Sequence, residues 1–281
     1  MLYYGYKLAI FLAIHLPLAV SYKLASLIAN LIYLFNHRLR VTIQSHISHL
    51  VQSTQLPLDA DRLTKETLVN FYKYLVDFFR VSRLTADYVS QHIPIHGKEY
   101  LDTAIAEGKK IVILTGHIGN WELGAVALSK LGYRFTSLAL DHPDPRVNRL
   151  FQKRRKSAGI QVYPLNITGI RECYKALESG RIVALLGDLE FGTGGIDMDW
   201  FGEKVKVPKG PAMLARRTGA IVIPAVMVRE KDDQLAIYIA PPMIPQKTDN
   251  PEQDIINDAK RYLEVFSQFI IKYPNQWYRF R

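Results

Sequence analysis

The 281-residue chain contains a single cysteine, Cys173. One cysteine excludes an intramolecular disulfide framework, and it excludes zinc or iron–sulfur sites that need several thiolates. Hydrophobic residues make up 48% of the chain and charged residues 22%, which excludes a disordered or fibrous protein. The length suits a large folded unit with a substantial core.

Acidic side chains are missing before Asp59, whereas Lys7, Lys23, Arg38 and Arg40 contribute four positive charges there. Residues 146–156 add six more cations and no acid, so these two stretches account for the whole net charge of +10. Localised positive charge predicts an anionic partner: nucleic acid, anionic lipid or an acidic carrier. Since the chain has no nucleic-acid-binding motif, we expect no nucleic acid.

The amino-terminal segment is strongly apolar, with Lys23 as the only charged residue from Leu8 to Phe35. Pro17 and Lys23 divide it into stretches that are each too short to span a bilayer, which takes about 20 residues. Tyrosines such as Tyr22 are placed as interfacial aromatics would be. The pattern favours a helical hairpin in the membrane interface, with residues 1–40 as an apolar, basic anchor. A buried core hairpin and a secretory signal are the alternatives.

Residues 41–281 change to short apolar runs that alternate with helical patterns, after a long amphipathic helix at 64–84. Strands are predicted at 111–115, 134–140, 160–164, 181–187, 221–228 and 234–239. Helices are predicted at 98–107, 121–131, 146–157, 168–179 and 211–218, and a last helix opens at Asn250. This alternation predicts an α/β domain whose central mixed, largely parallel sheet is flanked by helices.

The most informative segment is Gly116-His-Ile-Gly-Asn-Trp-Glu122, which follows a fully apolar predicted strand. Ligands bind at the carboxyl ends of strands in open α/β sheets. Gly119 permits a turn that would bring His117 and Glu122 together, and a carboxylate on one imidazole nitrogen makes the other a better general base. The residues equally allow Glu122 to stabilise a helix start capped by Asn120, with His117 as an ordinary turn residue.

This segment resembles the His-x4-Asp/Glu signature of the lysophospholipid/glycerolipid acyltransferase superfamily. It is most similar to the branch that contains the late lauroyl- and myristoyl-type acyltransferases of lipid A synthesis and the phosphatidylinositol mannoside acyltransferases. The similarity runs nearly end to end, and several blocks in the same order are far more specific than the short motif alone. The blocks are Arg155-Lys-Ser-Ala-Gly, Leu186-Gly-Asp-Leu-Glu-Phe-Gly, Pro208-Lys-Gly-Pro and Tyr273-Pro-Asn-Gln-Trp.

The resemblance implies an O-acyltransferase that moves a fatty acyl chain from an acyl carrier protein or coenzyme A thioester to a glycolipid hydroxyl. A lipid A precursor and mannosylated phosphatidylinositol are candidate acceptors. His117 would be the general base of a direct attack without a covalent intermediate, and Glu122 or Glu190 would be its partner; the choice between the two stays open. No metal or cofactor is expected. The implied location is the anionic cytoplasmic face of the bacterial inner membrane.

Five further residues are expected to contact substrate: Asn120, Arg149, Arg155, Asp188 and Lys209. The basic cluster at 146–156 suits an acidic carrier protein, coenzyme A phosphates or lipid headgroups, with a solvated helix face as the alternative. Two other functions remain open from the residues. One is a metal-dependent hydrolase with His117, Glu122, Asp188 and Glu190 as ligands, and the other is a non-catalytic protein that binds anionic membranes.

Overall fold

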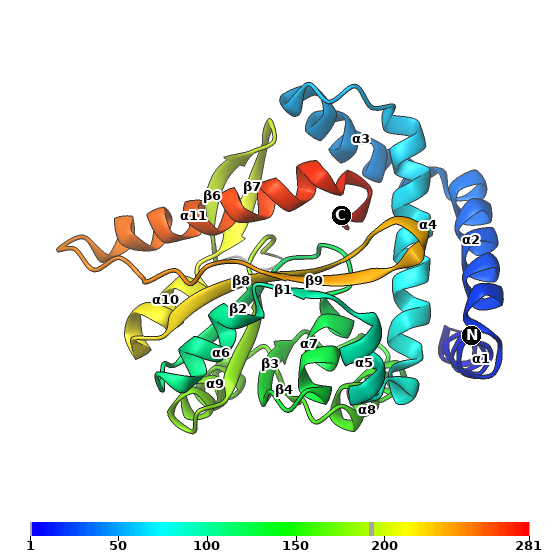
Figure 1. Ribbon diagram of the computed structural model, residues 1–281. Coiled ribbons are helices and arrows are strands. Elements are labelled where there is room, and N and C mark those ends of the chain that lie inside the picture. Colours follow the sequence, from blue (N-terminus) through cyan, green and yellow to red (C-terminus); the bar gives the residue numbers. More distant parts are fainter. Residues whose placement is uncertain (1, 191–193, 281) are drawn as a thin grey trace.

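A seven-stranded sheet lies at the centre of the computed structural model, which describes residues 2–190 and 194–280 (Figure 1). Its strand order is β1-β9-β8-β2-β5-β3-β4. Every neighbouring pair in it is parallel except β8 and β9, which are antiparallel. The strands are β1 (Ile95–His96), β2 (Ile111–Thr115), β3 (Phe135–Ala139), β4 (Gln161–Pro164), β5 (Ile182–Leu186), β8 (Ile221–Arg229) and β9 (Leu235–Ile239).

Both faces of the sheet are covered, which explains the continuous apolar runs of its strands. Successive side chains of β2 point to opposite faces, so Val112 and Leu114 join one hydrophobic core while Ile111 and Ile113 join the other. The first core includes α9 (Ile167–Glu178), α10 (Gly210–Thr218) and α11 (Pro251–Lys272). The second includes α4 (Ala60–Phe79), α5 (Ala86–His92), α6 (Lys98–Ala106) and α7 (Trp121–Lys130), with α8 (Pro145–Ser157) packed against it.

The α/β class with a largely parallel sheet, predicted from the sequence, is therefore confirmed. The six predicted strands match β2, β3, β4, β5, β8 and β9 to within one residue at each end. The sequence pattern missed the antiparallel hairpin of β6 (Gly195–Trp200) and β7 (Glu203–Pro208). Charged and buried residues alternate in β7, so it lacks the apolar run on which the other strands were recognised.

Three helices precede α4: α1 (Leu2–His15), α2 (Leu18–Phe35) and α3 (His37–Thr54). The chain breaks between α1 and α2 at Pro17, whereas Lys23, the other residue that divides the apolar segment, lies inside α2. Lysine is a good helix former, and Lys23 is exposed, so its charge does not interrupt the helix. By length and composition alone α2 could cross a membrane, but a core helix of a soluble protein or a secretory signal can have the same length and composition.

Helix α2 lies along α4 on the outside of the molecule (Figure 1). Its inner face is formed by small residues and one tyrosine: Ser21, Tyr22, Ala25 and Ala29 are buried. Its outer face leaves large apolar side chains exposed, with Phe35 at 83% exposure. The others are Val20, Leu27, Ile28, Leu31 and Leu34. Helices α2 and α3 share a hydrophobic cluster with α4, and the division of the chain at residue 40 stays a prediction.

Candidate active site

The sheet brings His117 and Asp188 to the same edge because each follows one of two neighbouring parallel strands. Strand β2 ends at Thr115 and β5 at Leu186, and these residues are paired across the ladder. A Cβ atom added to Gly116 would lie 3.1 Å from the side-chain carbon Cγ of Asp188. The glycine before His117 therefore lets the two chains approach closely at the carboxyl end of the strands, where α/β enzymes bind ligands.

His117 and Asp188 form a dyad with two hydrogen bonds. The ring atom Nδ1 of His117 lies 2.9 Å from Oδ1 of Asp188, and the backbone N–H of His117 donates to Oδ2 at 2.8 Å. The indole N–H of Trp277 also donates to Oδ2, at 3.2 Å. The Asp188 side chain is fully buried, whereas that of His117 is 16% exposed. A carboxylate on Nδ1 places the proton there, which makes Nε2 the basic nitrogen.

The charges of the dyad stabilise one another. Burial alone lowers the pKa of His117, but the charge and hydrogen bond of Asp188 outweigh burial and raise this pKa above its ordinary value. Burial alone raises the pKa of Asp188, yet the charge of His117 and the N–H donors of His117 and Trp277 hold it below its ordinary value. The geometry thus combines an ionised carboxylate with an imidazole of increased basicity.

The carboxylate on Nδ1 of His117 is therefore that of Asp188, whereas the sequence pointed to Glu122 or Glu190. Glu122 forms a forked ion pair with Arg155: Nε of Arg155 lies 2.9 Å from Oε2, and Nη2 contacts Oε1. Glu122 is in the first turn of α7, and Arg155 reaches it from the last turn of α8. Its charge makes only a smaller upward contribution to the pKa of His117.

Glu190 begins the segment that leads into the β6–β7 hairpin. Its backbone N–H donates to the carbonyl oxygen of Lys206 at 2.8 Å, and its side chain packs against Gly195. Residues 191–193 lie outside the described residues, and the first two of them end the block that resembles the acyltransferase branch.

Of the residues expected to contact substrate, Asn120 and Arg155 are engaged by other side chains, whereas Arg149 and Lys209 are exposed. Asn120 is only 2% exposed, and both ends of its amide are hydrogen-bonded: Oδ1 accepts the backbone N–H of Leu123 at 3.0 Å, and Nδ2 donates to Asp77 at 3.2 Å. Asn120 thus caps α7, and its contact with substrate stays a prediction. Arg155 is engaged by Glu122, as described above. Arg149 lies on the exposed surface of α8, and Lys209 is exposed just before α10.

Residues 276–278 complete the site, and the sequence gave them no role beyond the resemblance. The backbone N–H of Tyr278 donates to the carbonyl oxygen of His117 at 2.8 Å, and Gln276 accepts the N–H of Gly119 at 2.7 Å. Trp277, between these two residues in the sequence, donates its indole N–H to Asp188. The segment therefore fixes both members of the dyad. Trp121 adds an edge-on ring contact to His117, with ring centres 5.1 Å apart.

Comparison with known proteins identifies the family of this chain. The family model for bacterial lipid A biosynthesis acyltransferases matches residues 2–281. The chain belongs to this family. It is thus an acyltransferase, as the resemblance predicted.

Individual relatives from two groups of bacteria match this acyltransferase. A phosphatidylinositol mannoside acyltransferase of Mycolicibacterium smegmatis is 26% identical over 78% of this chain and 71% of its own length. One of Mycobacterium tuberculosis is 29% identical over 78% of this chain and 69% of its own length. A lipid A biosynthesis acyltransferase of Haemophilus influenzae is 26% identical over 64% and 55% of the two lengths.

A metal-dependent hydrolase, the alternative for the same residues, would need several of these side chains around one metal ion. In residues 2–190 and 194–280, no group of three or more histidine, cysteine or acidic side chains is placed to hold a metal ion. Of the four ligands considered from the sequence, Glu122 instead pairs with Arg155.

Proposed function

We propose that this acyltransferase moves a fatty acyl chain from an acyl carrier protein or coenzyme A thioester to a glycolipid hydroxyl, with His117 as general base. The observation that supports it is the buried Asp188–His117 pair at the carboxyl ends of β2 and β5. A lipid A precursor and mannosylated phosphatidylinositol are the acceptors suggested by the names of the relatives.

The reaction needs only one proton carrier. Nε2 of His117 takes the proton of the acceptor hydroxyl while its oxygen attacks the thioester carbonyl carbon. Asp188 stabilises the imidazolium that forms. The tetrahedral intermediate then collapses, the carbon–sulfur bond breaks, and the leaving thiolate takes the proton from Nε2. The products are an ester and a free thiol, and His117 returns to its neutral form.

The lone cysteine does not suit a covalent route. Cys173 lies in α9 and is only 1% exposed. Burial raises the pKa of its thiol to about 11, so the thiol stays protonated near neutral pH, whereas nucleophilic cysteines react as thiolates. Direct transfer of the acyl chain to the acceptor is therefore the mechanism that we propose.

In this proposal, the enzyme lies on an anionic membrane and meets its acyl donor and its acceptor there. The exposed apolar face of α2 is accompanied by exposed residues of α1, among them Tyr4 and Phe11. Helix α8, which carries the basic cluster, lies beside α1: the guanidinium of Arg146 lies 5.1 Å from the ring centre of Tyr3. An apolar face next to cations is the pattern of a helix that lies on anionic lipid. We place this contact at the cytoplasmic face of the inner membrane.

The test is acyl transfer by the purified full chain. Acyl carrier protein and coenzyme A thioesters would each be incubated with a lipid A precursor and with a mannosylated phosphatidylinositol, and products would be identified by mass spectrometry. We expect one acceptor to gain one acyl chain with the wild type and not with His117→Ala. His92→Ala, which removes an exposed histidine at the end of α5, is the matched control. Near-normal transfer by His117→Ala would refute the mechanism.

A further inference from the structure

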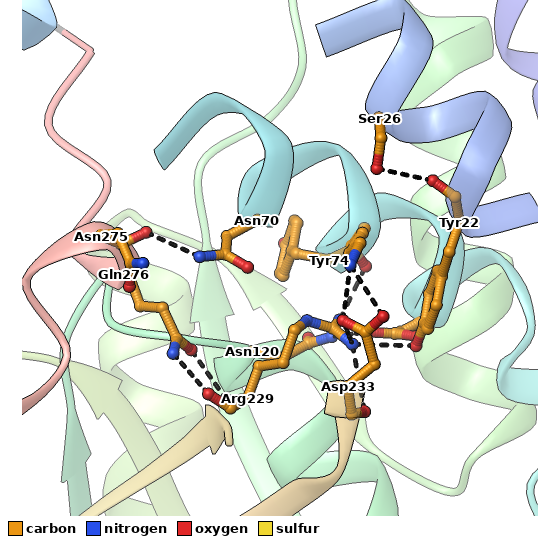
Figure 2. Close-up of polar contacts among 11 residues, drawn as sticks. Tyr22, Ser26, Asn70, Tyr74, Asn120, Arg229, Asp233, Asn275 and Gln276 are labelled. Atoms are coloured by element: carbon orange, nitrogen blue, oxygen red, sulfur yellow. Dashed lines mark hydrogen bonds and ion pairs between the residues drawn. The ribbon is translucent and has the colours of Figure 1, made fainter. Parts of the chain in front are cut away.

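A buried polar network joins α2 to α4 and β8. The hydroxyl of Tyr22 donates to Oδ1 of Asp77 at 2.5 Å. The guanidinium of Arg229 contacts both residues: Nη1 lies 3.0 Å from the Tyr22 oxygen, and Nη2 lies 2.5 Å from Oδ2 of Asp77. Figure 2 shows Tyr22 of α2 pointing toward Arg229. Their exposed fractions are 7%, 6% and 8%, so all three are out of solvent. We call Tyr22, Asp77 and Arg229 the α2 triad.

One branch of hydrogen bonds leads from the α2 triad to the loop that holds His117. Oδ2 of Asp77 accepts the side-chain amide of Asn120 at 3.2 Å. Asn120 caps α7, and its backbone N–H donates to the carbonyl oxygen of Met227 in β8 at 2.7 Å. The position of Asn120, three residues after His117, is therefore fixed from α4 and β8 together.

A second branch leads from the α2 triad to Asp188. The side-chain amide of Gln276 holds both backbone groups of Arg229: its Oε1 accepts the N–H at 2.8 Å, and its Nε2 donates to the carbonyl oxygen at 2.6 Å. The backbone carbonyl oxygen of Gln276 in turn accepts the N–H of Gly119, and the indole N–H of the next residue, Trp277, donates to Asp188. The first branch thus ends at the loop that holds His117, and the second ends at Asp188.

The network is electrostatically balanced. Asp77 and Asp233 face Arg229 and Lys73, whose ammonium lies 2.6 Å from Asp233. Apolar residues of similar volume would hold α2 against α4 equally well, because buried ion pairs add little net stability over such packing. Hydrogen bonds are directional, however, so they fix the positions of the groups that they join more closely than apolar packing does.

We propose that the α2 triad is a positioning device, in which Tyr22 from helix α2 sets the orientation of His117 and Asp188. This inference rests on the proposed function for its catalytic consequence. None of the three residues touches the reacting atoms in this scheme; each acts through the His117 loop or through residues 276 and 277. Their loss should change the rate of the chemical step without changing substrate binding.

The chain offers a matched control. Tyr33 also lies on α2, and its hydroxyl donates to Asp61 of α4 at 2.6 Å, but at an exposed part of the interface. Tyr22→Phe and Tyr33→Phe therefore each remove one tyrosine–carboxylate bond between the same two helices. Both substitutions keep the ring, so the packing of α2 is preserved. Arg229→Lys provides a second test of the α2 triad. It keeps the positive charge but removes the guanidinium group that contacts Tyr22 and Asp77 at once.

The kinetic readout is the separation of kcat from KM. We expect Tyr22→Phe to lower kcat about tenfold to a hundredfold, because a misplacement of reacting groups by ~1 Å has an effect of this order. The KM of donor and acceptor should stay within about twofold, since binding groups are untouched. Arg229→Lys should behave in the same way, and Tyr33→Phe should match the wild type.

A second readout does not depend on acyl transfer. The protein would be labelled with 5-fluorotryptophan, and the fluorine signals of Trp121 and Trp277 assigned by Trp→Phe substitution. We expect Tyr22→Phe and Arg229→Lys to shift both signals and Tyr33→Phe to leave them in place. Unchanged signals in Tyr22→Phe and Arg229→Lys would overturn the proposal whatever happens to the rate. If the wild type transfers no acyl chain but the signals shift, the proposed function fails and the positioning role stands.

Discussion

The carboxylate of Asp188 holds His117 at two points, with one oxygen on the ring nitrogen Nδ1 and the other on the backbone N–H of the same residue. A single carboxylate thus fixes both the tautomer of the imidazole and the position of its backbone. Since the ring is also in contact with Trp121, the imidazole has little freedom to turn.

The first prediction concerns the dependence of kcat/KM on pH. The pKa of His117 is raised above its ordinary value of 6.5, and only the neutral imidazole can accept a proton. The rate should therefore rise with pH through an inflection above 6.5. Asp188→Asn removes the charge that raises this pKa, so the inflection should move to lower pH. The plateau rate should fall roughly 10²–10⁴-fold. An inflection that stays in place would show that another group titrates.

The second prediction concerns the ion pair of Glu122 and Arg155. Glu122→Gln and Arg155→Gln should each lower the free energy of unfolding by about 2–3 kcal/mol, since each leaves a largely buried charge without its partner. The double variant should lose clearly less than the sum. Chemical denaturation measures all three. Simple additivity would mean that the pair does not act as a unit.

An exposed ion pair on α6 provides the control for this comparison. Lys98 and Asp102 are paired at 2.5 Å, but their side chains are 44% and 47% exposed. Breaking that pair should lower the free energy of unfolding by less than about 1 kcal/mol.

The third prediction concerns membrane contact. Phe35→Asp should reduce co-flotation with anionic phospholipid vesicles about tenfold or more, because burying a phenylalanine side chain contributes about 2 kcal/mol. Ile244→Asp is the control, because Ile244 is also an exposed apolar residue, at 74%. It belongs to the segment between β9 and α11, and the start of α11 lies on the other side of the molecule from α2 (Figure 1). If the two variants bound the vesicles equally, the proposal that α2 contacts the membrane would be wrong.

The fourth prediction concerns the turn after His117. Gly119 has a φ of +60°, and a Cβ there would lie 2.0 Å from the carbonyl oxygen of Met227. Gly119→Ala should therefore lower the free energy of unfolding by more than about 3 kcal/mol and reduce activity. Gly180 has a similar φ of +69° with open space around it, so Gly180→Ala should cost only the backbone strain of about 1–2 kcal/mol. Equal losses would show that the contact with Met227 can relax.

The sequence predicted what depends on neighbours along the chain. Apolar runs located the central strands, and the position of His117 just after one of them indicated the candidate site. The partner of His117 could not be predicted because it depends on the order of strands: Asp188 reaches His117 only since β5 pairs with β2. Tyr22 shows the same limit. Its place in an apolar helix suggested a membrane interface, whereas a buried carboxylate from α4 engages it.

Residues 276–278 make the dyad of His117 and Asp188 depend on a distant part of the chain, since Trp277 follows Asp188 by 89 residues. The dyad lacks the indole donor to Asp188 and the backbone donor to the His117 carbonyl oxygen until Trp277 and Tyr278 are in place. A chain truncated before residue 277 would therefore contain both members of the dyad without the two donors that hold them.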